Sequence, residues 1–260
     1  MGDIKGVIMA GGEGKRFRPL TYYFQKCMIP VGERQKPILE YIVRLFKHHK
    51  ISDIVLLVGY KHEQIVNYFN NGTRFGVNLV YLEDPPDLKG SANAILNAYK
   101  TGVISSDDRL VVYYGDIVSN IDLEGLLRQH EDEGADATVA LARGFKIRVG
   151  TANLEGRRIV DFIEKPIYDK PVSIGVLVLE GRALETLREL QAEGDFRLFD
   201  LMGDVVPYLV RHNYLVNAYL TDAFWYDVGS IERYERLDND ELNQEMGHIM
   251  KTSNLRGISP

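Results

Sequence analysis

The sequence has 260 residues, of which 45% are hydrophobic and 26% charged, as is typical of a globular protein. Its net charge of −6 argues against a nucleic acid partner. Its single cysteine, Cys27, excludes an internal disulfide and is typical of a reducing compartment. No signal peptide is evident, and no segment approaches the ~18 uncharged apolar residues of a membrane span. We therefore expect a cytoplasmic protein with no membrane partner.

The first half of the chain alternates short apolar runs with helical patterns. The runs are rich in Val, Ile, Leu and Tyr, as expected for strands that are buried on both faces. They lie at 4–9, 54–59, 77–82, 110–114 and 137–141, with helices at 37–46, 62–69 and 92–99 between them. This order predicts an α/β fold with a Rossmann-like, mixed but mostly parallel sheet flanked by helices. In such a sheet, ligands bind beyond the carboxyl ends of the strands.

The second half follows a different rhythm. We expect a hairpin with strands at 146–154 and 157–163 around Glu155-Gly156, a strand at 174–179, helices at 182–191 and 199–210, and a strand at 215–220. No linker separates the halves. We therefore expect one domain over 1–243, with lobes at about 1–143 and 144–243, the second an α+β elaboration of the same sheet. The polar segment 244–260 is expected to be a loosely held tail.

A glycine-rich loop follows the first strand. Gly11, Gly12 and Gly14 allow positive φ and close approach of the backbone to a ligand. Successive N–H groups in such a loop can point at phosphate oxygens, and Arg16 adds a planar fork of donors. The glycines alone would equally suit an ordinary turn. Their spacing matches neither GxxxxGK[ST] nor GxGxxG, which excludes the common ATPase loop and disfavours a dinucleotide fold.

The segments that follow carry a family resemblance. The patterns GGxGxRxxPLT at 11–21, KxxxPV at 26–31 and KPxLE at 36–40 stand in this order. Together they resemble the sugar-1-phosphate nucleotidylyltransferases, such as mannose-1-phosphate guanylyltransferase and glucose-1-phosphate thymidylyltransferase. The resemblance implies an enzyme of nucleotide-sugar biosynthesis, whose substrates are a nucleoside triphosphate and a sugar 1-phosphate. The gap between Pro30 and Lys36 is about two residues longer than is usual in the family.

The resemblance also implies the nucleotide contacts. In the family, the glycine loop wraps the triphosphate, and the arginine and the first lysine hold its phosphates. The stretch 88–95 resembles the family's LGTAxAL loop near the base and sugar, where a serine or threonine can cap the following helix. The carboxylate expected to contact the base is displaced, standing seven residues before the loop glycine. The implied nucleotide residues are Ala10, Gly11, Gly12, Gly14, Arg16, Lys26, Glu83, Gly90 and Ser91.

Two aspartates complete the predicted site. Asp116 ends an apolar strand, and Asp227 lies in FWYDVGS at 224–230, which resembles the family's WxDxGT. The resemblance implies that both coordinate magnesium. Mg²⁺ is typically bound by one or two carboxylates together with phosphate oxygens and water, so two aspartates are sufficient. Each aspartate alone would equally suit a turn or a helix cap.

The sugar-phosphate side is predicted from DFIEKP at 161–166, which resembles the family's FxEKP. The resemblance implies that Glu164 bonds sugar hydroxyls and that Lys165 grips the sugar phosphate. Gly150 and Gly175 match family glycines near the sugar. An ion pair at a strand end is the competing interpretation of Glu164 and Lys165.

The implied reaction is an in-line attack by a sugar-phosphate oxygen on the α-phosphorus, which releases pyrophosphate. The nucleophile is already anionic, so catalysis needs positioning and charge neutralisation, for which Arg16, Lys26 and Lys165 are the predicted catalytic residues. Guanylyl transfer to mannose 1-phosphate is slightly favoured over thymidylyl or uridylyl transfer to glucose 1-phosphate. The motifs disfavour a catalytically silent binding subunit on the same fold, and the glycine spacing disfavours an enzyme on a dinucleotide-binding fold. The sequence leaves a homo-oligomer open.

Overall fold

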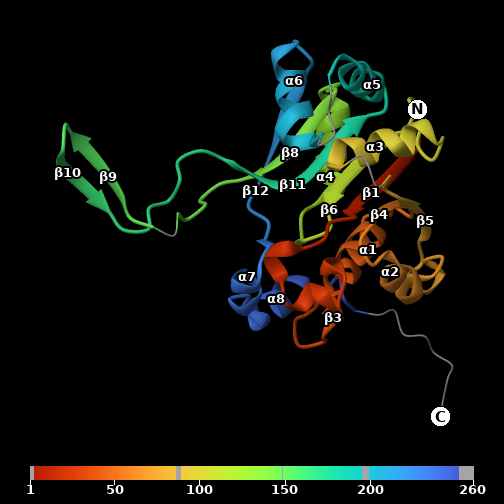
Figure 1. Cartoon of the computed structure of the whole chain (residues 1–260), viewed down its shortest axis with the longest axis horizontal. Coiled ribbons are helices and arrows are strands. Elements are labelled where there is room, and N and C mark those ends of the chain that lie inside the picture. The colour runs from red at the N-terminus through yellow and green to blue at the C-terminus, as the bar shows by residue number, and fades with distance from the viewer. Residues whose placement is uncertain (1–2, 86–88, 148, 195–198, 252–260) are drawn as a thin grey trace.

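The computed structural model describes residues 3–85, 89–147, 149–194 and 199–251 (Figure 1). Its strands are β1 (Ile4–Ala10), β2 (Pro30–Val31), β3 (Lys36–Pro37), β4 (Asp53–Val58), β5 (Asn78–Glu83), β6 (Arg109–Tyr114), β7 (Ile117–Ser119), β8 (Ala137–Ala142), β9 (Thr151–Glu155), β10 (Arg158–Ile163), β11 (Val172–Glu180), β12 (Val216–Thr221) and β13 (Trp225–Asp227). Its α-helices are α1 (Ile38–His48), α2 (His62–Phe69), α3 (Ser91–Lys100), α4 (Leu123–Asp132), α5 (Ala183–Glu193), α6 (Val206–Arg211), α7 (Ile231–Glu235) and α8 (Asn239–Met246). Short helical turns lie at Lys15–Phe17, Leu20–Tyr22, Lys26–Met28, Thr73–Phe75 and Leu201–Val205.

A seven-stranded sheet in the order β12-β8-β11-β6-β1-β4-β5 forms the centre of the molecule. Strand β1 pairs in parallel with both β4 and β6, while β11 runs antiparallel to β6 and β8. The predicted mixed, mostly parallel α/β sheet is therefore confirmed. All five strands predicted in the first half are present, with boundaries that differ by one residue.

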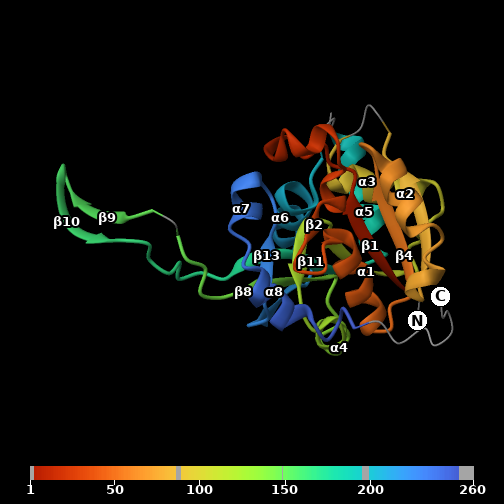
Figure 2. The ribbon, with the colours of Figure 1, turned by 90° about the horizontal axis from the view of Figure 1, so that it is seen from below.

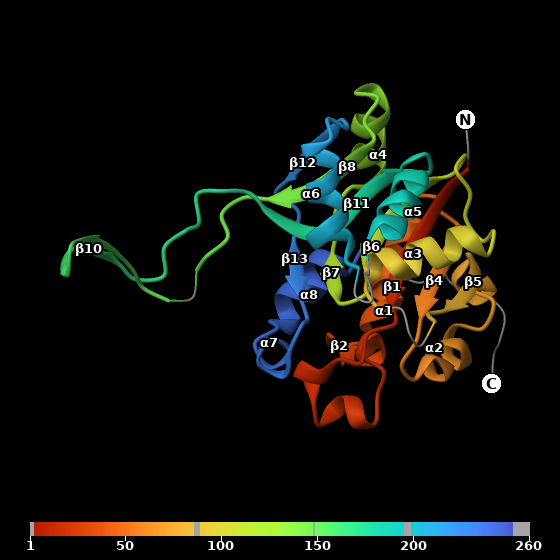
Figure 3. The ribbon, with the colours of Figure 1, turned by 45° about the horizontal axis from the view of Figure 1, so that its top comes forward.

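Helices cover both faces of this sheet (Figure 3). Successive residues of a strand point to opposite faces, and in β1 Val7 and Ile8 accordingly belong to two separate apolar clusters, both fully buried. The cluster around Ile8 includes residues of α1, α2, α4 and α8. The cluster around Val7 includes residues of α3, α5 and α6. Among the described residues, no helix is both long and apolar enough to cross a bilayer.

Strands β9 and β10 form the predicted hairpin, but it stands away from the rest of the molecule, as Figures 1 and 2 show from two directions. Two arms carry it, and they pair through an isolated bridge between Lys146 and Ile167. We call residues 145–147 and 149–168 the ribbon. The first strand of the hairpin was expected at 146–154 but begins only at Thr151, because the residues before it form part of this arm.

The expected loose tail is wrong for the part of it that is described. Met246, Ile249 and Met250 are buried, and the Arg34 guanidinium donates to the Met250 carbonyl at 2.6 Å. The Gly32 amide likewise donates to the Asn239 side chain at 3.1 Å. The longer segment between Pro30 and Lys36 is therefore where the C-terminal helix docks. Residues 252–260 lie outside the described residues.

Candidate active site

The glycine loop leaves the carboxyl end of β1, in the middle of the sheet. A Cβ added to Gly11 would lie 2.4 Å from Asp84 Oδ2, and Gly14 has a φ of 62°. Glycine is therefore required at both positions, for space in one case and for backbone conformation in the other. Gly11 and Gly12 line a cavity of about 880 Å³.

Lys26 lies beside this loop, with its ammonium paired to the Asp116 carboxylate. The Lys26 side chain is only 12% exposed, and its nitrogen lies 5.8 Å from the centre of the Phe17 ring. This pair joins the glycine loop to the carboxyl end of β6. A triphosphate that enters the cavity would therefore meet a cation whose position is fixed by packing.

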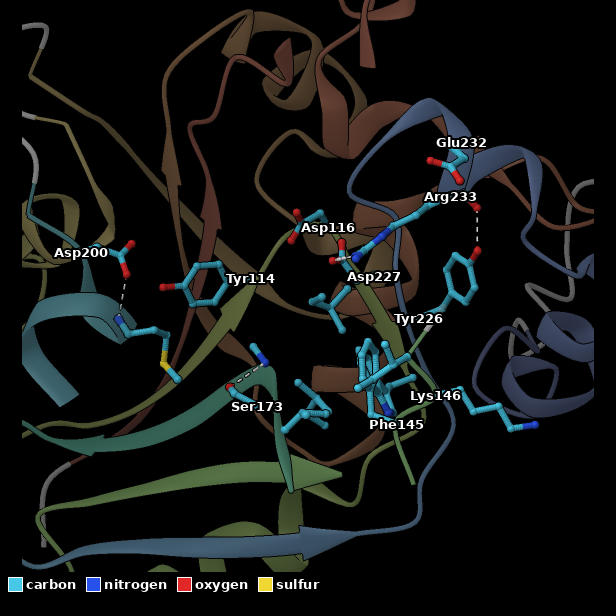
Figure 4. Close-up of a pocket in the computed structure, with 17 residues that line it drawn as sticks. Tyr114, Asp116, Phe145, Lys146, Ser173, Asp200, Tyr226, Asp227, Glu232 and Arg233 are labelled. Atoms are coloured by element: carbon cyan, nitrogen blue, oxygen red, sulfur yellow. Dashed lines mark hydrogen bonds and ion pairs between the residues drawn. The ribbon is translucent and has the colours of Figure 1, made fainter. Parts of the chain in front are cut away.

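Asp116 and Asp227 are brought together although they are 111 residues apart in the sequence. Strand β13 pairs antiparallel with β7, which places Asp227 opposite Ile117, and the Val228 amide donates to the Asp116 carbonyl at 2.8 Å. Figure 4 shows the two carboxylates close together at the edge of a second cavity, of about 930 Å³.

The pair meets the requirements of a magnesium site. Asp227 Oδ1 is buried without a hydrogen-bond partner in the described part of the chain, so it is available to a ligand. A Cβ on Gly229 would lie 2.5 Å from this oxygen, so glycine keeps the space beside it open. No group of three or more His, Cys, Asp and Glu side chains is arranged for a metal among the described residues. Two carboxylates are nevertheless the usual protein contribution for Mg²⁺ bound together with phosphates.

Two cations that the sequence analysis missed lie at the same cavity. Arg233, in α7, is ion-paired with Asp227 Oδ2, and Lys146 lines the cavity wall from the ribbon's first arm (Figure 4). Arg233 follows Asp227 by six residues, with the helix cap Ser230 between them. The sequence signal that could have identified Arg233 is a basic residue in the short helix that follows Asp227.

The two cavities are continuous, since Tyr114, Asp116 and Asp200 line both. The first is walled by the glycine loop, Lys26 and the start of α3. The second is walled by β11, the ribbon's first arm and β13. A ligand with a nucleotide at one end and a sugar at the other would span both, with Asp116 at the junction.

Ser91 lies at this junction, but not as a helix cap. It is the first residue of α3, which begins after Gly90, and no side chain caps that end. Its hydroxyl donates to Asp200 Oδ2 at 2.8 Å and accepts from the Tyr114 hydroxyl at 3.0 Å and from the Leu201 amide at 2.8 Å. The expected cap is therefore wrong, and Ser91 instead joins three elements below the cavity.

Two neighbouring carboxylates near the end of β5, Glu83 and Asp84, differ in their burial. Glu83 lines the first cavity with its side chain 66% exposed, 3.8 Å from the His62 ring nitrogen. Asp84, which the sequence analysis did not single out, has one oxygen buried without a hydrogen-bond partner among the described residues. Burial and the neighbouring Glu83 charge raise the pKa of Asp84 to about 6.

Burial likewise raises the pKa of the Cys27 thiol to about 12, which makes it unreactive at neutral pH.

Of three further predicted residues, Ala10 and Arg16 are absent from the lining of both cavities in the described part of the chain, whereas Gly175 lines the second cavity. The Ala10 side chain is buried in the core, and its carbonyl accepts from Gln25 at 2.7 Å. Arg16 is exposed on the turn Lys15–Phe17, outside the lining of either cavity as far as the described residues show. Gly175, with a φ of 71°, does line the second cavity, at an irregularity in β11.

Gly150, Glu164 and Lys165 are not brought to the cavities. They lie on the ribbon, where Glu164 and Lys165 are 62% and 67% exposed and 4.0 Å apart. A Cβ on Gly150 would lie 2.3 Å from the Phe162 ring, so this glycine permits close packing within the hairpin. Lys165 therefore does not share a cavity with Lys26, Asp116 and Asp227 within this one chain.

Comparisons with known proteins agree with this geometry. A family model described as nucleotidyl transferase matches residues 5–244. UTP–glucose-1-phosphate uridylyltransferase of Synechocystis sp. is 29% identical over 95% of this chain and 65% of its own length. Glucose-1-phosphate adenylyltransferase of Deinococcus deserti is 25% identical over 92% of this chain and 67% of its own length. The chain thus spans about two thirds of these relatives.

Two further proteins match over nearly their full length. D-glycero-α-D-manno-heptose 1-phosphate guanylyltransferase of Aneurinibacillus thermoaerophilus is 27% identical over 91% of this chain and 98% of its own. A crystal structure of a candidate glucose-1-phosphate thymidylyltransferase from Bacillus anthracis, solved with a sucrose, superposes with a TM-score of 0.73 and 24% identity. It covers 93% of this chain and 96% of its own, which shows a shared fold. By the family model, its motifs and this fold, the chain belongs to the nucleotidyl transferase family.

Proposed function

We propose that the protein joins the nucleoside monophosphate part of a triphosphate to a sugar 1-phosphate and releases pyrophosphate. The observation that carries the proposal is the pairing of β13 with β7, which brings Asp227 to Asp116, a residue that also lines the cavity of the glycine loop. The family relatives support the reaction class, since they are named as uridylyl-, adenylyl- and guanylyltransferases of sugar 1-phosphates.

In the proposed reaction, a sugar-phosphate oxygen forms a bond to the α-phosphorus as the bond to the bridging oxygen of pyrophosphate breaks. The attacking oxygen is already anionic, so the chain needs no general base. Lys26 would balance charge on the triphosphate, and Arg16 would reach the leaving pyrophosphate from the exposed turn beside the loop. We assign residues 1–143 to the nucleotide side and 144–243 to the sugar-phosphate side.

Asp116 and Asp227 would hold a magnesium ion, which when bound supplies positive charge beside the reacting phosphates. The unpaired buried oxygen of Asp227 supports this assignment. Lys26 and Arg233 are ion-paired with the two aspartates. Binding would require each cation to move from its carboxylate to a phosphate oxygen, a short displacement for a long side chain.

The decisive test is pyrophosphate release by wild-type protein and by Asp116→Asn and Asp227→Asn. Each variant keeps the side-chain size and loses the negative charge, so we expect at least about a 100-fold loss of turnover. Asp222→Asn, at an exposed aspartate five residues before Asp227, is the matched control and should retain full activity. Circular dichroism should show all three folded. Unchanged turnover in either cavity variant would contradict the metal assignment.

For the substrate, we propose guanylyl transfer to mannose 1-phosphate, supported only by the form of KPILE at 36–40 and GSANAI at 90–95. The measurement is a matrix of four triphosphates against several sugar 1-phosphates, read by mass spectrometry of the nucleotide sugar. A preference for dTTP or UTP with glucose 1-phosphate would replace this choice. Nucleotide binding without product in any combination would instead indicate a catalytically silent subunit.

A further inference from the structure

The ribbon is an ordered element that has no core of its own. Its arms are tied by backbone hydrogen bonds from Ile147 to Pro166 at 2.9 Å and from Tyr168 to Phe145 at 2.7 Å. Figures 1, 2 and 3 show from three directions that the hairpin β9–β10 points away from the sheet and its helices. Every residue of β10 is exposed.

The hairpin nevertheless has one apolar face. Cross-strand partners share a face, and side chains two residues apart along a strand do so as well. The partners Ile159 and Leu154 therefore lie on the same face as the partners Phe162 and Ala152. The opposite face is mostly polar and carries the pairs Arg158–Glu155 and Asp161–Asn153, with Ile163 and Thr151 paired at the end of the hairpin nearest the arms.

This apolar face is open to solvent in the single chain. Phe162, Leu154 and Ile159 are 59%, 62% and 58% exposed. An antiparallel hairpin with one apolar and one polar face is built to pack on its apolar side, and a two-stranded hairpin by itself is marginally stable in water. A covering surface must come from elsewhere.

The position of Glu164 and Lys165 identifies that surface. They follow β10 directly, next to the apolar face, and the resemblance of DFIEKP at 161–166 to the family motif implies that they contact the sugar phosphate. The second cavity of their own chain is lined by the carboxylates of Asp116, Asp200, Asp227 and Glu232 and by the cations Lys146 and Arg233, the latter paired with Asp227. A sugar phosphate dianion there would gain from a further cation, which this chain carries on a ribbon directed away from its own body.

A second copy of the chain satisfies both requirements. The base of the ribbon lies in the wall of the second cavity, where Phe145 stacks on Trp225 with ring centres 6.2 Å apart. Two copies related by a twofold axis could therefore exchange ribbons, since each ribbon starts at one cavity and reaches outward to the other. Such a twofold dimer is a closed assembly, because the same contact between ribbon and cavity is made twice, once by each copy.

We propose that the protein is a dimer in which each ribbon packs its apolar face on the other copy and delivers Glu164 and Lys165 to the sugar-phosphate side of that copy's cavity. The choice of the other copy as the covering surface rests on the position of Glu164 and Lys165 beside the uncovered face. The role of the two delivered residues rests on the proposed function.

The assembly is tested by sedimentation velocity over micromolar concentrations. Wild-type protein should sediment as a dimer, and Leu154→Ser/Phe162→Ser should raise the dissociation constant at least about 100-fold, since four apolar side chains per dimer are removed. Ile4→Ser/Val80→Ser is the control, because these side chains are also exposed, at 41% and 40%, and lie away from the ribbon and the second cavity. A monomeric wild type, or a ribbon variant that dimerises as tightly as the control, would overturn the proposal.

The exchange is tested by complementation. Chains carrying Asp116→Asn and chains carrying Glu164→Ala/Lys165→Ala are co-expressed with different tags, and mixed dimers are isolated through both tags. If the ribbon acts on the other copy, one of the two cavities is intact, and about half of the wild-type activity should return at low sugar 1-phosphate. If the ribbon acts on its own chain, both cavities are defective and the mixed dimer is no more active than its parents, which would overturn the exchange. A wild type that is inactive with every substrate pair would refute the proposed function, and sedimentation would still decide the assembly.

Discussion

The buried carboxylate of Asp84 makes the stability of the fold depend on pH in a direction opposite to that of an ordinary aspartate. Its pKa is raised from 3.8 to about 6 by burial and by Glu83. The folded protein therefore binds the proton more tightly than the unfolded chain does. The contribution to stability is fully present below about pH 4, falls as the pH rises toward 6, and is lost above that.

The magnitude follows from the shift. Two pKa units correspond to about 3 kcal/mol, and because part of the carboxyl is exposed we expect about 1–2 kcal/mol. Asp84→Asn keeps the shape and has no charge to lose. The free energy of unfolding of this variant, relative to wild type, should therefore rise by about 1–2 kcal/mol between pH 4 and pH 7.5.

Urea unfolding followed by circular dichroism at half-unit pH steps measures this difference. Asp107→Asn, on an exposed turn, is the control and should show a constant difference from wild type. The comparison between variants cancels the titration of all other groups. A difference for Asp84→Asn that stays flat across the range, or that falls with pH, would refute the reasoning.

Three further predictions concern packing. Ser91→Ala removes the hydroxyl that joins three elements, so the free energy of unfolding measured by urea titration should fall by about 1–3 kcal/mol. An unchanged free energy of unfolding would show that water replaces the hydroxyl. Gly175→Ala should cost about 1 kcal/mol in thermal unfolding because of its φ of 71°, and an unchanged Tm would mean that the strand relaxes there. Deleting residues 244–260 uncovers Leu242 and should lower the Tm by several degrees. Iodoacetamide labelling of the buried Cys27 thiol gives a second measure of unfolding. A Tm equal to that of wild type would contradict the packed C-terminal segment.

The sheet could be predicted because its central strands are buried on both faces and are therefore almost continuously apolar. The run at 110–114, for example, became β6 with one added residue, Arg109. The irregular elements could not be predicted in the same way. The helix expected at 199–210 is a π-helical turn at Leu201–Val205 followed by a short α-helix. In its first turn the Asp200 carboxylate accepts from two backbone amides, and the Leu201 amide donates to the Ser91 hydroxyl.

The candidate site likewise contains residues that could be predicted from the sequence and residues that could not. Residues at strand ends, such as Gly11 and Asp116, could be placed from the sequence because topology carries every parallel strand to one edge. Arg233 was missed because its position depends on how α7 turns after β13, which no local pattern encodes. Lys165 was assigned to a common cavity because its motif implies a role there, whereas the structure places it on the ribbon, exposed and outside the lining of both cavities as far as the described residues show.

The pairing of β13 with β7 also has a consequence for synthesis of the protein. Asp116 leaves the ribosome early, together with the strands and loop that shape the nucleotide side, whereas Asp227 follows more than a hundred residues later. Strand β11, which pairs with β6, and β13, which pairs with β7, are likewise made only after Asp116, so the carboxyl end of β6 lacks these neighbours until most of the chain has been synthesised. The pair of aspartates is therefore assembled only when β13, the last of the described strands, has paired with β7.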